Sequence, residues 1–85
     1  MKVHFFAAAR AAAGTASYEV PATFETLGEV LEFLKQSLTG STAGGMSFAQ
    51  VLEQCSFLLD GVASEAGASV RDATRLDVLP PFAGG

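Results

Sequence analysis

The segment from Thr26 to Leu38 constrains the fold most, because it has the pattern of one well-delimited amphipathic helix. Thr26 and Glu29 have the spacing of a capping box, in which each side chain satisfies a backbone N–H near the other. Apolar residues then recur as a single stripe: Leu27, Val30, Leu31, Leu34 and Leu38. Gly40 follows as the predicted C-cap. A helix with one apolar stripe needs one surface to pack on, and a small sheet provides it.

Segments that alternate apolar and polar residues flank this helix on both sides and predict strands. They are residues 1–8, 16–20 and 75–79. In the first, Val3 and Phe5 share one face, while His4 and Phe6 share the other. Phenylalanine on both faces indicates a strand whose outer face is also covered or meets a partner. The Ala-rich stretch 7–13 is too short for a firm helix, so we expect a loop or one helical turn there.

Two further local patterns lie between the long helix and the last strand. Ser47 and Gln50 form a second capping box and predict a shorter helix. The pair Asp60-Gly61 separates two short apolar runs and predicts a hairpin, because a type I′ turn needs positive φ at both positions. The runs are residues 56–59 and 62–64.

This order of elements predicts an α+β fold, a ubiquitin-like β-grasp with a small mixed sheet and one main helix packed across it. At 85 residues the chain has room for one core. We therefore predict a β-grasp domain over residues 1–79 and an extended tail over residues 80–85, since Pro80 and Pro81 cannot donate to a strand ladder.

Composition excludes several classes of protein. Apolar residues make up 49% and charged residues 16%, which excludes a disordered chain and leaves apolar surface for an interface. The net charge of −4 argues against nucleic acid as a partner. One cysteine excludes a disulfide framework within the chain. Without a signal-peptide pattern or an apolar run of membrane-spanning length, we expect a cytoplasmic protein that does not bind membranes.

The last six residues, Pro80 to Gly85, have the composition of a projecting tail. The two prolines favour an extended conformation, and the five residues after Pro80 reach roughly 16 Å. Gly84 and Gly85 present no side chain, so their backbone can enter a channel too narrow for other residues.

Residues 78–85, Val-Leu-Pro-Pro-Phe-Ala-Gly-Gly, resemble the terminus of the small subunit of molybdopterin synthase, a MoaD-type sulfur carrier of the MoaD/ThiS family. The opening from Val3 to Gly14 is similar to that family's V-x-F-F-A-x-x-R-x-x-x-G. The chain departs from the family at Asp60-Gly61, usually Asn-Gly, and at residues 74–77, usually Gly-Asp-Glu. These differences leave open which sulfur pathway is served.

The resemblance implies a non-catalytic subunit whose active-site residues lie on its partner. A MoeB/ThiF-like adenylyltransferase would use ATP to adenylate the Gly85 carboxylate, and a sulfurtransferase would then supply sulfur to give a thiocarboxylate. Gly84 would let the tail thread into a MoaE-type large subunit of a heterotetrameric synthase. There sulfur would pass to cyclic pyranopterin monophosphate in molybdenum cofactor biosynthesis. No bound cofactor and no metal site are implied for this chain.

We predict that partners bind the exposed face of the sheet, with aromatic side chains as anchors. Arg10 would meet acidic groups of the partner. The predicted partner-binding residues are Phe6, Arg10, Leu79, Pro80, Pro81, Phe82 and Ala83.

Three other functions remain open from the sequence. The chain could be a ThiS-like carrier for thiazole or a carrier for cysteine synthesis, although Pro80-Pro81 and the double phenylalanine favour the molybdopterin branch. It could be a ubiquitin-like modifier that forms an isopeptide bond through Gly85. It could also be a binding domain with an inert tail.

Other candidate residues have simpler interpretations. Cys55 could relay sulfur as a persulfide, but its place on the apolar side of a short helix favours a buried small hydrophobe. His4 has no second metal ligand at a useful spacing. The acidic residues Glu25, Glu29 and Glu32 are most simply a solvated helix face, and Gly44-Gly45 a flexible loop.

Overall fold

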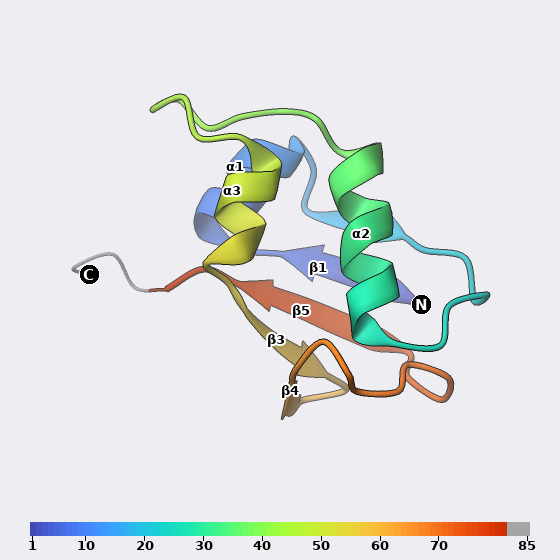
Figure 1. Cartoon of the computed structure of the whole chain (residues 1–85). Helices are drawn as coiled ribbons and strands as arrows, with labels where there is room; N and C mark the ends of the chain where they lie inside the picture. Colours follow the sequence, from blue (N-terminus) through green and yellow to red (C-terminus); the bar gives the residue numbers. More distant parts are fainter. Residues whose placement is uncertain (82–85) are drawn as a thin grey trace.

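The computed structural model describes residues 1–81, and the fold is shown in Figure 1. The elements follow the predicted order, with one additional helix near the start. They are β1 (Lys2–Phe5), α1 (Ala7–Ala13), β2 (Ser17–Glu19), α2 (Leu27–Ser37), α3 (Phe48–Glu53), β3 (Ser56–Leu59), β4 (Val62–Ser64) and β5 (Arg75–Leu79).

The five strands form one mixed sheet in the order β2-β1-β5-β3-β4. β1 and β5 lie side by side and parallel, although they stand near opposite ends of the sequence, and the other pairs are antiparallel. Figure 1 shows all three helices on the same side of this sheet. This arrangement confirms the predicted α+β, ubiquitin-like β-grasp fold.

The hydrophobic core lies between the helices and the covered face of the sheet. Phe5 of β1 meets Phe48 of α3 edge to face, with ring centroids 5.5 Å apart. Within residues 1–81 no polar or charged side chain is buried. The largest fully buried side chains are Phe48, Leu27, Leu34, Leu52, Leu76, Val3, Val20, Val30 and Val78.

Both predicted capping boxes are confirmed. At the start of α2, Thr26 Oγ1 accepts from the Glu29 backbone N–H (3.3 Å), while Glu29 Oε1 accepts from that of Thr26 (3.2 Å). The predicted C-cap is wrong, because α2 ends at Ser37 and its C-cap is Leu38 rather than Gly40. Gly40 has a different role: a Cβ at this position would collide with the Ala12 carbonyl oxygen, so only glycine lets this loop approach α1.

The predicted Asp60-Gly61 hairpin is also confirmed, with φ of 47° and 85° at the two positions. The Asp60 carboxylate additionally accepts hydrogen bonds from the Thr74 backbone N–H (3.1 Å), the Thr74 hydroxyl (2.8 Å) and the Arg75 backbone N–H (2.9 Å). These bonds lower the pKa of Asp60. One side chain therefore fastens the hairpin to the start of β5.

The expectation of a strand over residues 1–8, and of a loop or one helical turn over residues 7–13, is wrong in part. β1 ends at Phe5, and α1 occupies Ala7–Ala13. Short alanine helices are marginal in isolation, but Ala9 and Ala12 are fully buried here and α1 packs on α3. Tertiary packing, which a local pattern does not show, stabilises this helix. Gly14 caps it with φ of 77°.

Candidate functional site

The open face of the sheet, opposite the helices, carries alternate residues of each strand. In the central strands His4 of β1 lies beside Asp77 of β5, which lies beside Leu58 of β3. All three side chains are partly exposed. Their neighbours along β5, Leu76 and Val78, point to the core and are fully buried. The predicted alternation along this strand is therefore confirmed.

One end of the open face is charged. Lys2 lies between Glu19 of β2 and Arg75 of β5 in the sheet register. Arg75 Nε donates to Asp77 Oδ1 at 2.7 Å, and the amino group of Met1 pairs with Glu19 at 3.1 Å. The charged end was not predicted, although the alternation along β1 and β5 places Lys2, Arg75 and Asp77 on one face.

The other end of the open face is apolar and lies where the tail begins. Phe5 is level with Val78 across the parallel pair, so the register carries Phe6 and Leu79 to the same end of the sheet. Phe6 is 40% exposed, and within residues 1–81 the only other exposed large apolar side chain is Val62, on the edge strand β4. Leu79 is partly exposed and pairs with Ser56 of β3. An exposed aromatic beside an aliphatic side chain is typical of a binding surface.

The junction of β1 with α1 holds Phe6 on this face. Phe6 has an extended backbone and serves as the N-cap of α1, and its carbonyl accepts from the N–H groups of Ala9 (3.0 Å) and Arg10 (3.3 Å). The next residue, Ala7, has φ of 49°, a left-handed conformation that costs a non-glycine residue energy. Arg10 is exposed in the last turn of α1.

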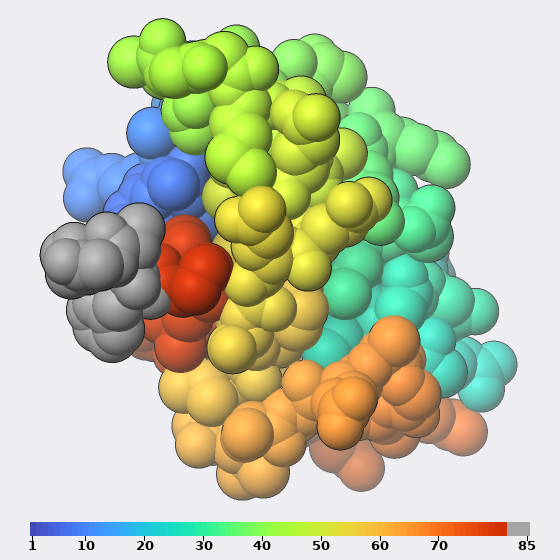
Figure 2. Space-filling view, turned by 60° about the vertical axis from the view of Figure 1, so that its left-hand side comes forward, coloured from blue at the N-terminus to red at the C-terminus, as the bar shows by residue number. Residues whose placement is uncertain are grey.

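The tail leaves the sheet from its middle. β5 ends at Leu79, Pro80 is half-buried and Pro81 is exposed. Figure 2 shows the last described residues, in red, at the surface between the blue segment of α1 and the yellow segment of α3 and β3. The predicted site residues Phe82, Ala83, Gly84 and Gly85 lie outside the described residues.

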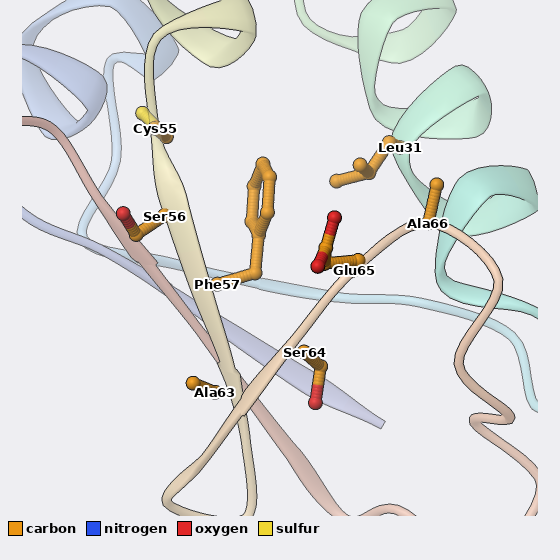
Figure 3. Close-up of a pocket in the computed structure, with 8 residues that line it drawn as sticks. All are labelled: Leu31, Cys55, Ser56, Phe57, Ala63, Ser64, Glu65 and Ala66. Atoms are coloured by element: carbon orange, nitrogen blue, oxygen red, sulfur yellow. The ribbon is translucent and has the colours of Figure 1, made fainter.

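Cys55 does not have the properties of a sulfur relay. Its thiol is half-buried and donates to the Val51 carbonyl at 3.2 Å. Burial raises the pKa of the Cys55 thiol to about 11, so the nucleophilic thiolate is scarce at neutral pH. Figure 3 shows Cys55 at one end of an apolar pocket, with Phe57 of β3 and Leu31 of α2 along it. The interpretation of Cys55 as a small apolar residue fits this environment better.

The described part of the chain holds no group of three or more His, Cys, Asp or Glu side chains that could bind a metal ion. His4 lies on the open face beside Asp77. No helix in residues 1–81 is both long and apolar enough to cross a membrane.

Comparison with known proteins agrees with this architecture. Residues 3–85 match the ThiS family. The fold is similar to that of SAMP1 from Haloferax volcanii, a crystal structure with a TM-score of 0.67 and 22% sequence identity. That similarity covers 99% of this chain and 97% of the SAMP1 chain. No curated protein matches the sequence. The chain therefore belongs to the ThiS family of small ubiquitin-like proteins, which serve as sulfur carriers or protein modifiers together with an E1-like activating enzyme and a sulfurtransferase.

Proposed function

We propose that this protein is a sulfur carrier whose Gly85 carboxylate is adenylated and then converted to a thiocarboxylate. The observation that carries the proposal is the family match, which runs through the Gly-Gly pair to residue 85. The position of the tail supports it, because Pro80 and Pro81 follow the central strand beside the apolar end of the open face. An enzyme that docks on this face would have the tail within its reach.

The proposed chemistry follows from the properties of a carboxylate. An α-carboxyl with a pKa of about 3.5 is ionised at neutral pH and is a poor acyl donor. Attack of a Gly85 oxygen on the α-phosphorus of ATP releases pyrophosphate and leaves an acyl-adenylate. The terminal sulfur of a persulfide on the sulfurtransferase then displaces AMP to give an acyl disulfide. A second thiol attacks the donor's sulfur and forms a disulfide with it, and the sulfur released from that bond leaves as the Gly85 thiocarboxylate. The E1-like partner binds the ATP and supplies the catalytic groups.

We further propose the molybdopterin branch, with this chain as the small subunit of molybdopterin synthase. Pro80-Pro81 ahead of the glycines and the pair Phe5-Phe6 favour this branch over thiazole or cysteine synthesis. A MoaE-type large subunit would dock on the apolar end of the open face, where Phe6 and Leu79 are accessible. The tail would enter its active site and deliver sulfur to cyclic pyranopterin monophosphate.

Mass spectrometry of the intact protein from cells tests the carrier function. A sulfur carrier gains the mass difference between sulfur and oxygen, and thiocarboxylate-specific alkylation removes the shifted species. The matched control lacks Gly85 and gains no sulfur. A ladder of conjugates on lysines of other proteins would instead establish a modifier, and an unmodified mass in cells that contain the activating enzyme would contradict both.

Co-purification tests the branch separately. The full chain is expected to retain a MoaE-type subunit, and cells without the chain are expected to lose molybdoenzyme activity. Rescue of thiazole or cysteine synthesis, with molybdoenzyme activity unaffected, would reject the molybdopterin branch and leave sulfur carriage intact.

A further inference from the structure

A second accessible surface lies on the solvent side of α2. This surface, the α2 groove, is a hollow of about 520 Å³ lined by Phe24, Gly28, Glu29, Glu32, Phe33 and Gln36 among others. It is formed by the exposed side of α2 and the loop that precedes it. Since Leu27, Val30 and Leu34 turn the other side of α2 toward the core, the groove faces away from the sheet.

Two phenylalanines give the α2 groove a preformed aromatic wall. The ring centroids of Phe24 and Phe33 are 5.2 Å apart, with the ring planes tilted by 48°. Phe33 also packs against Tyr18 of β2, with a centroid separation of 6.5 Å. Contact with β2 therefore holds Phe33 in place. The Phe24 and Phe33 side chains remain only partly buried.

Two carboxylates give the α2 groove a negative charge. Glu29 Oε1 accepts hydrogen bonds from the backbone N–H groups of Glu25 (2.7 Å) and Thr26 (3.2 Å). Within residues 1–81, no donor forms a hydrogen bond with Glu29 Oε2. These bonds lower the pKa of Glu29, which keeps it ionised. Glu32 meets Lys35 through Oε2 at 3.3 Å and likewise retains its Oε1.

We propose that the α2 groove docks a basic, partly apolar segment of a partner protein. An apolar side chain would lie against Phe24 and Phe33, and a neighbouring arginine or lysine would pair with Glu32 and Glu29. Charge complementarity supports this occupant, because no basic side chain from residues 1–81 lines the groove. A cation over an aromatic face gains further attraction. A second copy of this chain, with its net charge of −4, is disfavoured.

The position of the α2 groove makes this a second interface. The groove lies on the side of α2 that faces away from the sheet. The open face is the side of the sheet without helices, and the tail begins at the end of β5 (Figure 1). A partner bound in the groove therefore leaves Phe6 and Leu79 accessible. Docking in the groove requires none of the chemistry proposed for Gly85.

Titration of the full ¹⁵N-labelled chain with the peptide acetyl-Leu-Arg-Leu-Arg-amide tests the proposal by NMR. We expect the largest amide shift changes at Phe24, Gly28 and Phe33, with none at Phe6 or Leu79. The charge-reversed peptide acetyl-Leu-Glu-Leu-Glu-amide should produce no such changes. Higher salt should weaken binding, because exposed charge pairs are screened.

Two matched variants separate the groove from general attraction to an acidic protein. Glu32→Gln should lower the peptide affinity by about threefold, as expected for one exposed ion pair. Glu53→Gln removes the same charge from an exposed position on α3 and should leave the affinity unchanged. Phe24→Leu, which keeps an apolar side chain, should weaken binding through loss of the aromatic face. Equal losses for both glutamate variants, shifts at the open face, or no saturable binding would each overturn the proposal.

Discussion

The two faces of the sheet come from alternate residues of the same strands, yet they differ in character. On the helix-covered face the central side chains are at most 2% exposed: Val3, Phe5, Leu76 and Val78. On the open face the alternate positions are partly or largely exposed: Lys2, His4, Phe6, Arg75, Asp77 and Leu79. Burial restricts the first face to apolar residues that fit together. The second face has no such restriction and is therefore free to carry recognition.

The open face is itself graded along the strands. Lys2 and Arg75 make one end charged, and Phe6 and Leu79 make the tail end apolar. In protein interfaces, a few buried anchors, often aromatic, supply most of the affinity, while peripheral charges steer the encounter. The gradient therefore suits a partner that buries the tail end most deeply.

The largest expected effect comes from truncating the covered face. Leu76→Ala should lower the free energy of unfolding by about 2–5 kcal/mol, because it leaves a cavity at a fully buried position. Leu79→Ala, three residues along the same strand and partly exposed, should cost less than about 1 kcal/mol. Urea denaturation of both variants measures the difference. Equal losses would show that the open face also contributes to the core.

Truncating the open face should affect binding rather than folding. Phe6→Ala should lower the affinity for the E1-like enzyme by about tenfold or more, as expected for an aromatic anchor. Its free energy of unfolding should change by no more than about 0.5 kcal/mol. Isothermal titration calorimetry and urea denaturation provide the two readouts.

Val62→Ala is the matched control for Phe6→Ala. Val62 is 66% exposed but lies on the edge strand β4, away from the tail. The Val62→Ala variant should bind the E1-like enzyme with the same affinity as the unmodified protein. A similar loss for both variants would place the interface elsewhere and argue against the apolar end as the docking site.

The Asp60 carboxylate extends the comparison to the end of β5 opposite the tail. Its pKa is lowered in the folded state, so it stabilises the fold above its unfolded-state pKa of about 3.9. This contribution is lost as the pH falls through the lower folded-state pKa. Asp60→Asn keeps a residue that tolerates positive φ but removes the charge, and should lower the urea midpoint at pH 7 by less than Leu76→Ala does.

Asp72→Asn is the control for that measurement, because Asp72 is exposed and takes no part in the hydrogen bonds that Asp60 accepts from Thr74 and Arg75. Its urea midpoint should match that of the unmodified protein. The gap between the Asp60 variant and the unmodified protein should narrow in acid. A gap that stays constant down to pH 2 would show that the carboxylate charge is not responsible.

The sequence predicted those parts of the fold that rest on neighbours in the chain. Both capping boxes and the Asp60-Gly61 hairpin are local patterns, and they were confirmed. Helix α1 was missed because its stability comes from α3, nearly forty residues away along the chain. The parallel pairing of β1 with β5 is equally non-local and was left undetermined.

The open face and the α2 groove also differ in how far the sequence predicted them. Alternation along β1 marked Phe6 as an open-face residue, because a strand shows its two faces in its sequence. The α2 groove was not predicted, and its glutamates were interpreted as a solvated face. Its wall joins Phe24 of a loop to Phe33 of the helix, and only the folded chain brings them together.

The smallest expected effect concerns the junction that separates the two faces. Ala7, at φ of 49°, lets the chain pass from Phe6 on the open face to Ala9 in the core. Ala7→Gly removes about 1 kcal/mol of left-handed strain, but glycine loses about as much entropy on folding. The free energy of unfolding should therefore change by no more than about 0.5 kcal/mol.

If the strain helps to fix the Phe6 ring, partner affinity should still fall by about two- to threefold in Ala7→Gly, because the looser junction must be ordered on binding. Gly14→Ala, which introduces strain at the other end of α1, should lower stability without this loss of affinity. Unchanged affinity in Ala7→Gly would show that packing alone positions Phe6.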